Sequence, residues 1–172
     1  GAGQRALHEY RTALELDPAY SPAAEALAFL AIRQGDPDAG MAHALLAVRI
    51  GQERAEAWLA LGRAHLARGE PHDATVALTT AAGLHPNHPY CRRALAEAWI
   101  ALGEAERAED EMRHAVRIDP CWCEARLAWG DALCTLGRRA EGEAAYHAAV
   151  TSNPECLDAD GRPGLSFALD SL

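Results

Sequence analysis

Apolar residues recur along the chain at positions i, i+3, i+4 and i+7 in segments of about 14 residues, with polar residues between them. Such spacing places the apolar residues on one face of a helix. Glycine and proline interrupt the pattern at regular places and mark turns between the segments. The pattern therefore predicts a series of short amphipathic helices joined by tight turns.

The turn residues repeat with a period of 34 residues. Small residues inside the segments follow the same period, and Gln52 occupies the one place where a proline of the series is missing. A fixed period of this length is the sequence signature of a repeat architecture. The periodic glycines are Gly35, Gly69, Gly103 and Gly137, the prolines are Pro18, Pro86, Pro120 and Pro154, and one series of small residues is Ala28, Gly62, Ala96 and Gly130.

Each residue type in the period has a physical role. We expect the periodic glycines to end helices, because glycine adopts the left-handed backbone conformation at a helix C-terminus at little cost. Proline is tolerated in the first helical turn, so Pro37 and Pro71 should open the next helices, and Ser21 should cap the helix that follows it. The small residues should let paired helices approach closely, while larger ones such as Leu78 and Tyr146 fill the seams between them.

The 34-residue pattern of helix, turn and helix resembles the tetratricopeptide repeat family. The resemblance covers roughly residues 4–156, and several periodic series of residues agree in one register. It implies an all-α fold, a right-handed α-solenoid of antiparallel helix pairs. The repeat that carries the family's pattern most clearly has Trp58, Leu61, Gly62, Gly69, Ala74, Leu78, Ala81 and Pro86 at the family's spacing.

The resemblance divides the chain into four full repeats and a leading half repeat. Residues 1–20 should hold the second helix of a truncated leading repeat, because the chain opens in mid-repeat. Residues 157–164 are rich in Asp, Gly and Pro, so residues 157–172 should form a linker and a C-terminal capping helix, with disorder or contact with another chain as the alternatives. The full repeats are expected at residues 21–54, 55–88, 89–122 and 123–156.

Composition supports a helical chain and limits the function classes. The chain has 39 Ala among 172 residues and only 6% aromatic residues, which disfavours β-structure. Its net charge of −9 argues against nucleic acid or an anionic membrane surface as a partner. No apolar stretch reaches about 18 residues, so we expect no membrane insertion. An odd number of cysteines, 5, suggests reduced thiols and a cytoplasmic location, with the periplasm left open.

The sequence offers little sign of catalysis. It has no glycine-rich phosphate loop, no nucleophile elbow and no His-Glu-x-x-His helix, so we expect no enzyme activity and no cofactor. One group of metal-ligand types is present: His85, His88 and Cys91, followed by Cys121 and Cys123. Because the two halves of this group occupy nearly equivalent places in successive repeats, stacking should hold them about 10 Å apart. We therefore interpret them as loop residues and predict no metal site.

The resemblance implies that the first helices line a concave groove that binds an extended peptide or a helix of a partner protein. Tyr90 and Arg93 are of the types that most often become binding hot spots. The alternative for Arg93 is an ion pair with Glu97, one helical turn away. The family's inward-facing positions, carried over to this sequence, are Phe29, Leu59, Arg63, Leu66, Tyr90, Arg93, Glu97, Ile100, Leu127 and Asp131.

Two other functions stay open from the sequence: self-assembly through exposed ends of the solenoid, and a role as the non-catalytic repeat region of a larger enzyme such as a transferase. One subfamily function is not expected. Some members of the family grip the C-terminal carboxylate of chaperones with Lys, Arg and Asn at set positions of the groove. The corresponding positions here are Glu25, Phe29, Ala60, Tyr90 and Ala94, which form no cationic clamp.

Overall fold

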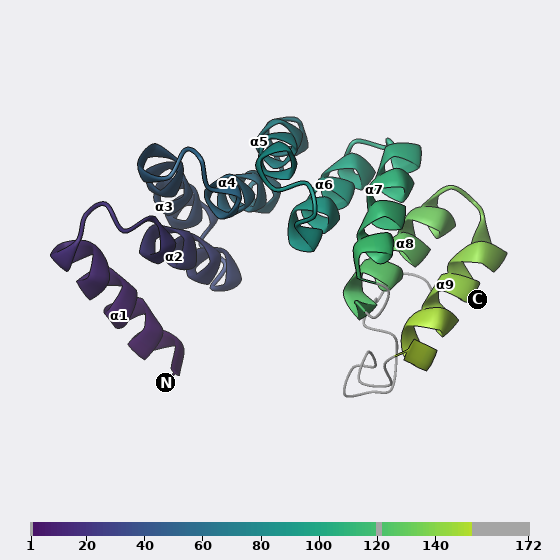
Figure 1. Cartoon of the computed structure of the whole chain (residues 1–172), viewed down its shortest axis with the longest axis horizontal. Helices are drawn as coiled ribbons and strands as arrows, with labels where there is room; N and C mark the ends of the chain where they lie inside the picture. The colour runs from purple at the N-terminus through teal and green to yellow at the C-terminus, as the bar shows by residue number, and fades with distance from the viewer. Residues whose placement is uncertain (1, 120–121, 153–172) are drawn as a thin grey trace. The chain divides into compact units, whose positions relative to one another are not determined.

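The computed structural model describes residues 2–119 and 122–152, and within them the chain forms nine α-helices and no strand (Figure 1). The all-α prediction is confirmed. The predicted linker and capping helix fall outside the described residues. The helices are α1 (Ala2–Leu16), α2 (Ser21–Arg33), α3 (Pro37–Ile50), α4 (Ala55–Ala67), α5 (Pro71–Leu84), α6 (Pro89–Ala101), α7 (Ala105–Ile118), α8 (Cys123–Thr135) and α9 (Arg139–Ser152).

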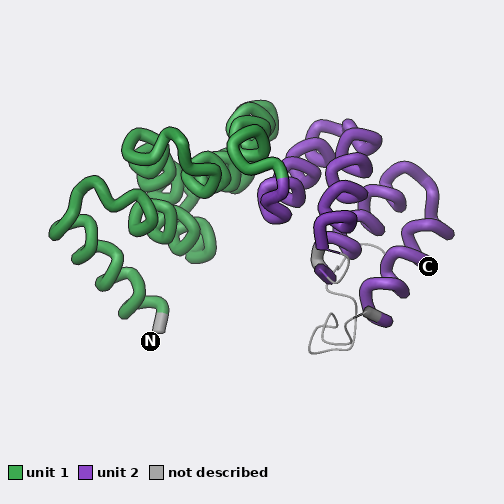
Figure 2. Tube along the Cα trace, in the orientation of Figure 1, with its two compact units in different colours: residues 1–86 green, residues 87–172 purple. Residues whose placement is uncertain are grey.

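The chain forms two compact units, unit 1 with residues 1–86 and unit 2 with residues 87–172 (Figure 2). In unit 1, α2 pairs with α3 and α4 pairs with α5, while α1 packs on α2 and α2 also packs on α4. In unit 2, α6 pairs with α7 and α8 pairs with α9, and α6 packs on α8. Inside each unit, helix pairs thus stack in the order of the sequence.

All four turns inside the helix pairs close in the same way. The periodic glycines have φ between 73° and 79°, in the left-handed region. The residue after each glycine donates its backbone N–H to the carbonyl five residues earlier, for example Glu70 to His65 at 2.9 Å and Arg138 to Leu133 at 2.9 Å. This is the bonding of a Schellman motif, which favours glycine at the left-handed position. The predicted role of the glycines is confirmed.

The starts of the helices follow the prediction only in part. Pro37 and Pro71 open α3 and α5 as expected, and the carboxylate of Asp36 caps α3 by accepting the N–H of Ala39 at 3.0 Å. The prediction for Ser21 is wrong, because Tyr20 occupies the N-cap of α2 and makes no side-chain cap. The Ser21 hydroxyl is buried and has two acceptors within hydrogen-bond distance, Oε1 of Glu25 at 2.8 Å and the carbonyl of Ala47 at 3.2 Å. The hydroxyl of Ser21 therefore bonds inside the core and does not cap the helix.

Small residues dominate the cores of both units. In α4, a Cβ added at Gly62 would lie 2.4 Å from Cγ of Leu78, and in α8 a Cβ at Gly130 would lie 2.3 Å from Cε1 of Tyr146. The larger partner on the second helix of the pair therefore packs directly on the backbone of the first helix. This confirms the expectation that small residues allow paired helices to approach closely.

None of the described helices combines the length and the apolar character that crossing a bilayer requires. Cys91 and Cys134 keep their thiols, whereas Cys123 takes part in a disulfide. This differs from the expectation of reduced thiols throughout, which was the basis for a cytoplasmic location. The choice between cytoplasm and periplasm therefore stays a prediction.

Candidate interaction surface

The predicted groove residues of unit 1 lie on α2 and α4, and each is at least partly covered. Phe29 packs against a buried cluster that includes Met41 and Leu61. Arg63 and Leu66, on α4, are half-buried. The predicted groove side chains on the first helices of unit 1 are thus half-buried or buried.

In unit 2, four residues form what we call the aromatic–arginine cluster: His88, Tyr90, Arg93 and Trp122. Tyr90, in the first turn of α6, is 54% exposed. Its ring meets the ring of Trp122 edge to face at 5.0 Å between centroids and that of His88 at 5.9 Å. Cζ of Arg93 lies 6.0 Å from the centroid of Trp122, a cation–π distance. The first turn of α6 and the N-cap of α8 therefore build one aromatic surface.

Arg93 also forms an ion pair along its own helix. Its Nε lies 3.3 Å from Oε1 of Glu97, one turn further along α6. The ion pair expected between Arg93 and Glu97 is thus present, while the role of Arg93 in binding stays a prediction. Ile100, next on the same helix, is half-buried against the core of unit 2. The pair and the Trp122 ring together fix the position of the guanidinium group.

Two of the predicted groove residues are core residues instead. Leu59 is 8% exposed and Leu127 is 6% exposed. Leu127 packs with Cys123, Ala149 and Tyr146 between α8 and α9. Neither leucine offers a surface to a partner.

Asp131 faces the second helix of its own pair. Its Oδ1 accepts the hydroxyl proton of Tyr146 at 2.7 Å. Burial raises the pKa of the Asp131 carboxyl, and the hydrogen bond from Tyr146 opposes this rise. The pKa of Tyr146 is raised mainly by burial, and further by its bond to Asp131. Asp131 is therefore a half-buried seam residue whose charge is engaged inside the helix pair.

One pair of register positions carries a contact in both units. Glu25, the fifth residue of the predicted repeat 21–54, is buried. It pairs with Arg54, the last residue of that range, through Nε–Oε1 at 2.7 Å and Nη2–Oε2 at 3.1 Å. Arg93 and Trp122 occupy the same two positions in the third repeat. The contact is an ion pair in unit 1 and a cation–π contact in unit 2, so the same geometry presents an aromatic face only in unit 2.

Sequence reasoning missed the place of Trp122 in this surface. The periodic pattern treats the residue before each first helix as a loop position, and Tyr20, Arg54 and His88 share that register with it. The signal that could have found it is the period itself, because the last residue of a repeat lies beside the first turn of that repeat's own first helix. A tyrosine and a tryptophan in those two places predict a ring contact.

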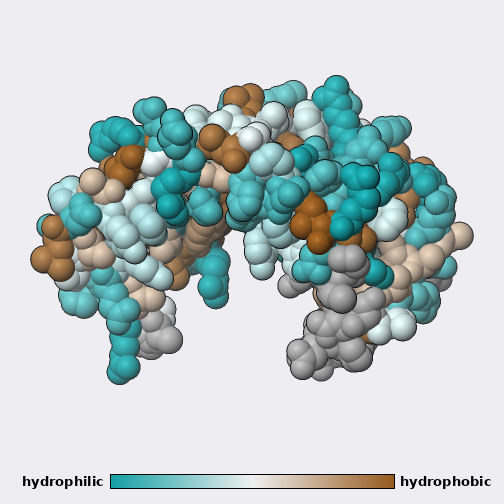
Figure 3. Space-filling model, in the orientation of Figure 1, coloured by the Kyte–Doolittle hydropathy of each residue, from teal (hydrophilic) through white to brown (hydrophobic). Residues whose placement is uncertain are grey.

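The exposed apolar residues outside the cluster are scattered. On the face drawn in Figure 3, hydrophobic side chains form small separate patches among hydrophilic ones. Leu45 and Val76, which are 54% and 68% exposed, lie on the second helices α3 and α5. The aromatic–arginine cluster differs from these residues because its exposed Tyr90 ring contacts the rings of Trp122 and His88.

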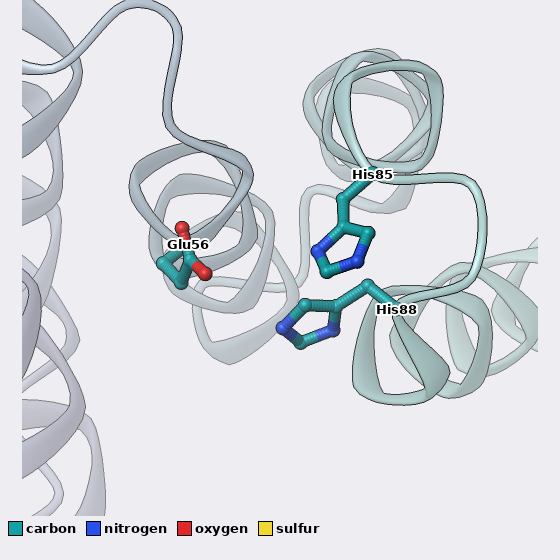
Figure 4. A group of neighbouring side chains, drawn as sticks. All are labelled: Glu56, His85 and His88. Atoms are coloured by element: carbon teal, nitrogen blue, oxygen red, sulfur yellow. The ribbon is translucent and has the colours of Figure 1, made fainter.

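The prediction that the metal-ligand types are loop residues is right only in part: His85 and His88 lie at helix caps, whereas Cys91 lies in α6 and Cys123 in α8. Cys91 is fully buried in unit 2, and its backbone N–H donates to Nδ1 of His88 at 3.3 Å, so this histidine serves as the N-cap of α6. His85 belongs to unit 1, where its ligand nitrogen lies within 4.8 Å of a carboxylate oxygen of Glu56. Figure 4 shows the side chains of Glu56, His85 and His88.

The described helices define the class of protein: an all-α solenoid built from stacked helix pairs. Two family models described as tetratricopeptide repeat match residues 65–121 and 30–75, which together span more than half of the chain. The chain belongs to the tetratricopeptide repeat family. A search of curated proteins finds no match.

Solved structures with the same fold share little sequence with this chain. A thermophilic tetratricopeptide repeat protein of Thermus thermophilus, TTC0263, has a TM-score of 0.82 at 21% identity and covers 92% of this chain and 86% of its own. MamA has a TM-score of 0.71 at 22% identity and covers 87% of both chains. YrrB, described as a repeat protein with an unusual peptide-binding site, has a TM-score of 0.68 at 21% identity and covers 90% of this chain and 79% of its own.

Proposed function

We propose that this protein is a non-catalytic interaction scaffold that binds a peptide or a helix of a partner protein on the surface of its first helices. The observation that carries the proposal is the aromatic–arginine cluster of unit 2. Tyr90 exposes more than half of its surface, although it is large and partly apolar. Membership of the tetratricopeptide repeat family supports a protein partner in general terms, and the peptide-binding site named for YrrB supports a peptide as the ligand.

The cluster has the composition and the rigidity of a binding hot spot. Tyrosine, tryptophan and arginine are the residues enriched in hot spots. The Tyr90 ring lies against Trp122, and Trp122 lies under a guanidinium group that Glu97 holds in place. A partner therefore meets side chains that are already ordered, which lowers the entropy lost on binding.

The charges of the cluster favour a partner with both apolar and acidic groups. Arginine has five N–H donors, and Nε of Arg93 is the one that faces Glu97, so the terminal nitrogens of the guanidinium group can donate to a ligand. A carboxylate of a bound peptide can accept from these donors while an apolar side chain covers the Tyr90 ring. Leu59 and Leu127 take no part, because they are buried.

The test compares the affinity of a partner, identified by cross-linking to the wild-type chain, for matched variants. Tyr90→Ala and Arg93→Ala should each cost roughly 1–3 kcal/mol of binding free energy, which is about 5-fold to 150-fold in Kd, with little change in melting temperature. Leu45→Ala, which removes an equally exposed side chain from the second helix α3, is the control and should bind like the wild type. If both cluster variants keep full affinity, the first-helix surface of unit 2 is not the binding site.

Light scattering on the purified chain addresses self-assembly in the same experiment. A monomer supports a heterologous partner. If the wild type is an oligomer and Tyr90→Ala is a monomer, the partner of this surface is instead a second copy of the chain.

A further inference from the structure

The turn between α4 and α5 brings together three side chains of metal-ligand type within unit 1. His65 lies near the end of α4, Glu70 at the N-cap of α5 and Asp73 in the first turn of α5. One ligand atom from each lies within 4.8 Å of the other two. Nδ1 of His65 and Oε2 of Glu70 are only 2.8 Å apart. We propose that this turn binds a divalent transition-metal ion of the zinc type, a function separate from the interaction surface of unit 2.

The donor set suits such an ion. Zinc takes imidazole nitrogen and carboxylate oxygen at about 2.0–2.2 Å, so its ligand atoms lie roughly 3–4 Å from one another. The three atoms in this turn lie within 4.8 Å of one another, and Asp73 is exposed, so its side chain can turn toward the ion. Three protein ligands leave the fourth position to water, as in open zinc sites.

The backbone of the turn holds two of the ligands in place. Gly69 has a φ of 73°, and the N–H of Glu70 bonds the carbonyl of His65 at 2.9 Å. The Glu70 side chain makes no cap to its own helix, in contrast to Asp36 at the same place in the preceding turn. Its carboxylate is instead directed back toward His65, whose side chain is only 19% exposed. A ligand pair ordered before the ion arrives loses little entropy on binding.

Arg68 is the group that opposes the ion. Its Nε lies 3.1 Å from Oε1 of Glu70 and 3.7 Å from Oδ1 of Asp38. The ion would use Oε2 of Glu70, the oxygen that faces His65, while Arg68 stays on Oε1 and orients the carboxylate, the role of an outer-shell partner. The positive charge of Arg68 repels the ion, so the ion should bind more weakly here than at a site with four protein ligands.

The other three turns of the described chain provide an internal comparison. They share the backbone of this turn but not its donor set. In the turn between α6 and α7, Arg107 takes the place of Asp73 and lies over the ring of Trp99, at 4.7 Å from its centroid. The residues at the three ligand positions are Ala31, Asp36 and Ala39 in one turn, Trp99, Glu104 and Arg107 in the next, and Leu133, Arg138 and Glu141 in the last.

The experiment is a calorimetric titration of the full chain with Zn²⁺ at pH 7, after removal of any affinity tag and of chelator. His65→Ala and Asp73→Asn should each weaken Zn²⁺ binding by roughly 10-fold or more, since loss of even an outer-shell partner costs that much. His72→Ala is the matched control, because His72 is exposed in the same helical turn of α5 and lies outside the ligand group. His85→Ala removes the histidine that lies beside Glu56 and should also leave this binding unchanged.

Thermal unfolding gives a second readout that does not depend on heat of binding. Saturating Zn²⁺ should raise the melting temperature of the wild type and of His72→Ala, and should leave that of Asp73→Asn unchanged. Asp73 is exposed, so this variant tests the site even if His65→Ala fails to fold. Absence of Zn²⁺ uptake by the wild type, or equal affinity in Asp73→Asn and the wild type, would overturn the proposal.

Discussion

Replacement of Gly130 by alanine should destabilise unit 2, whereas the same replacement of Gly83 should stabilise the protein slightly. Both glycines lie inside helices, α8 and α5, and neither has a positive φ. They differ in what the new methyl group meets. At Gly130 it would lie 2.3–2.8 Å from three ring carbons of Tyr146, while nothing lies within 4 Å of it at Gly83.

The expected magnitudes follow from three contributions. Alanine in place of a helical glycine is favourable by about 0.5–1 kcal/mol, and this gain is the whole effect at Gly83. At Gly130 the methyl group pushes the Tyr146 ring outward, and overpacking of this kind costs about 1–3 kcal/mol. Movement of the ring also strains the hydrogen bond between Tyr146 and Asp131, worth about 1 kcal/mol. The net loss for Gly130→Ala is therefore about 1–3 kcal/mol.

Urea unfolding monitored by circular dichroism measures both variants against the wild type. A double-mutant cycle with Tyr146→Ala isolates the clash, because Gly130→Ala should cost little or nothing once the ring is gone. If Gly130→Ala is as stable as the wild type in the presence of Tyr146, the reasoning about the α8–α9 seam is wrong. An unstable Gly83→Ala would likewise refute the comparison, since no neighbour explains it.

Two further predictions concern charge. Burial raises the pKa of Asp131 in the folded state, so the folded protein holds this proton to higher pH than the unfolded chain. The stability of the wild type relative to Asp131→Asn should therefore fall as pH rises through and above the usual aspartate pKa of about 4. Urea titrations of both proteins would contradict this if the relative stability of the wild type grew with pH. A peptide with a chaperone-type C-terminal carboxylate should show negligible binding by calorimetry. The first position of the clamp is Glu25, a buried carboxylate paired with Arg54, so it offers no positive charge. A micromolar Kd would refute this prediction.

The sequence predicted the features that local chemistry alone determines. Gly103 and the other three periodic glycines had to end helices, because the left-handed conformation strongly favours that residue type. The packing of Tyr146 on Gly130 followed from the period, since small and large residues alternate between the paired helices. These features depend on residues within one repeat, where spacing along the chain largely determines which residues lie close in space.

Features that depend on depth of burial could not be predicted in this way. Leu59 and Arg63 sit one turn apart on the same helix, yet only the leucine is buried, and the pattern gave both the same inward-facing role. Ser21 has the residue type of a cap, but its burial beside Glu25 redirected the hydroxyl. The contact of Tyr90 with Trp122 joins the two ends of one repeat, which a search within single helices does not compare.

The order in which the helices pack has a consequence for how the chain folds. In the described part of each unit, helices meet the next helix or the next but one along the sequence. Contacts between near neighbours in sequence close only short loops, and proteins built from them fold quickly. Stability in such an array is a sum of single repeats and their interfaces, so amide hydrogen exchange should be graded along each unit. Exchange should be faster in α1, whose main contact is with α2, than in α2, which packs on α1, α3 and α4.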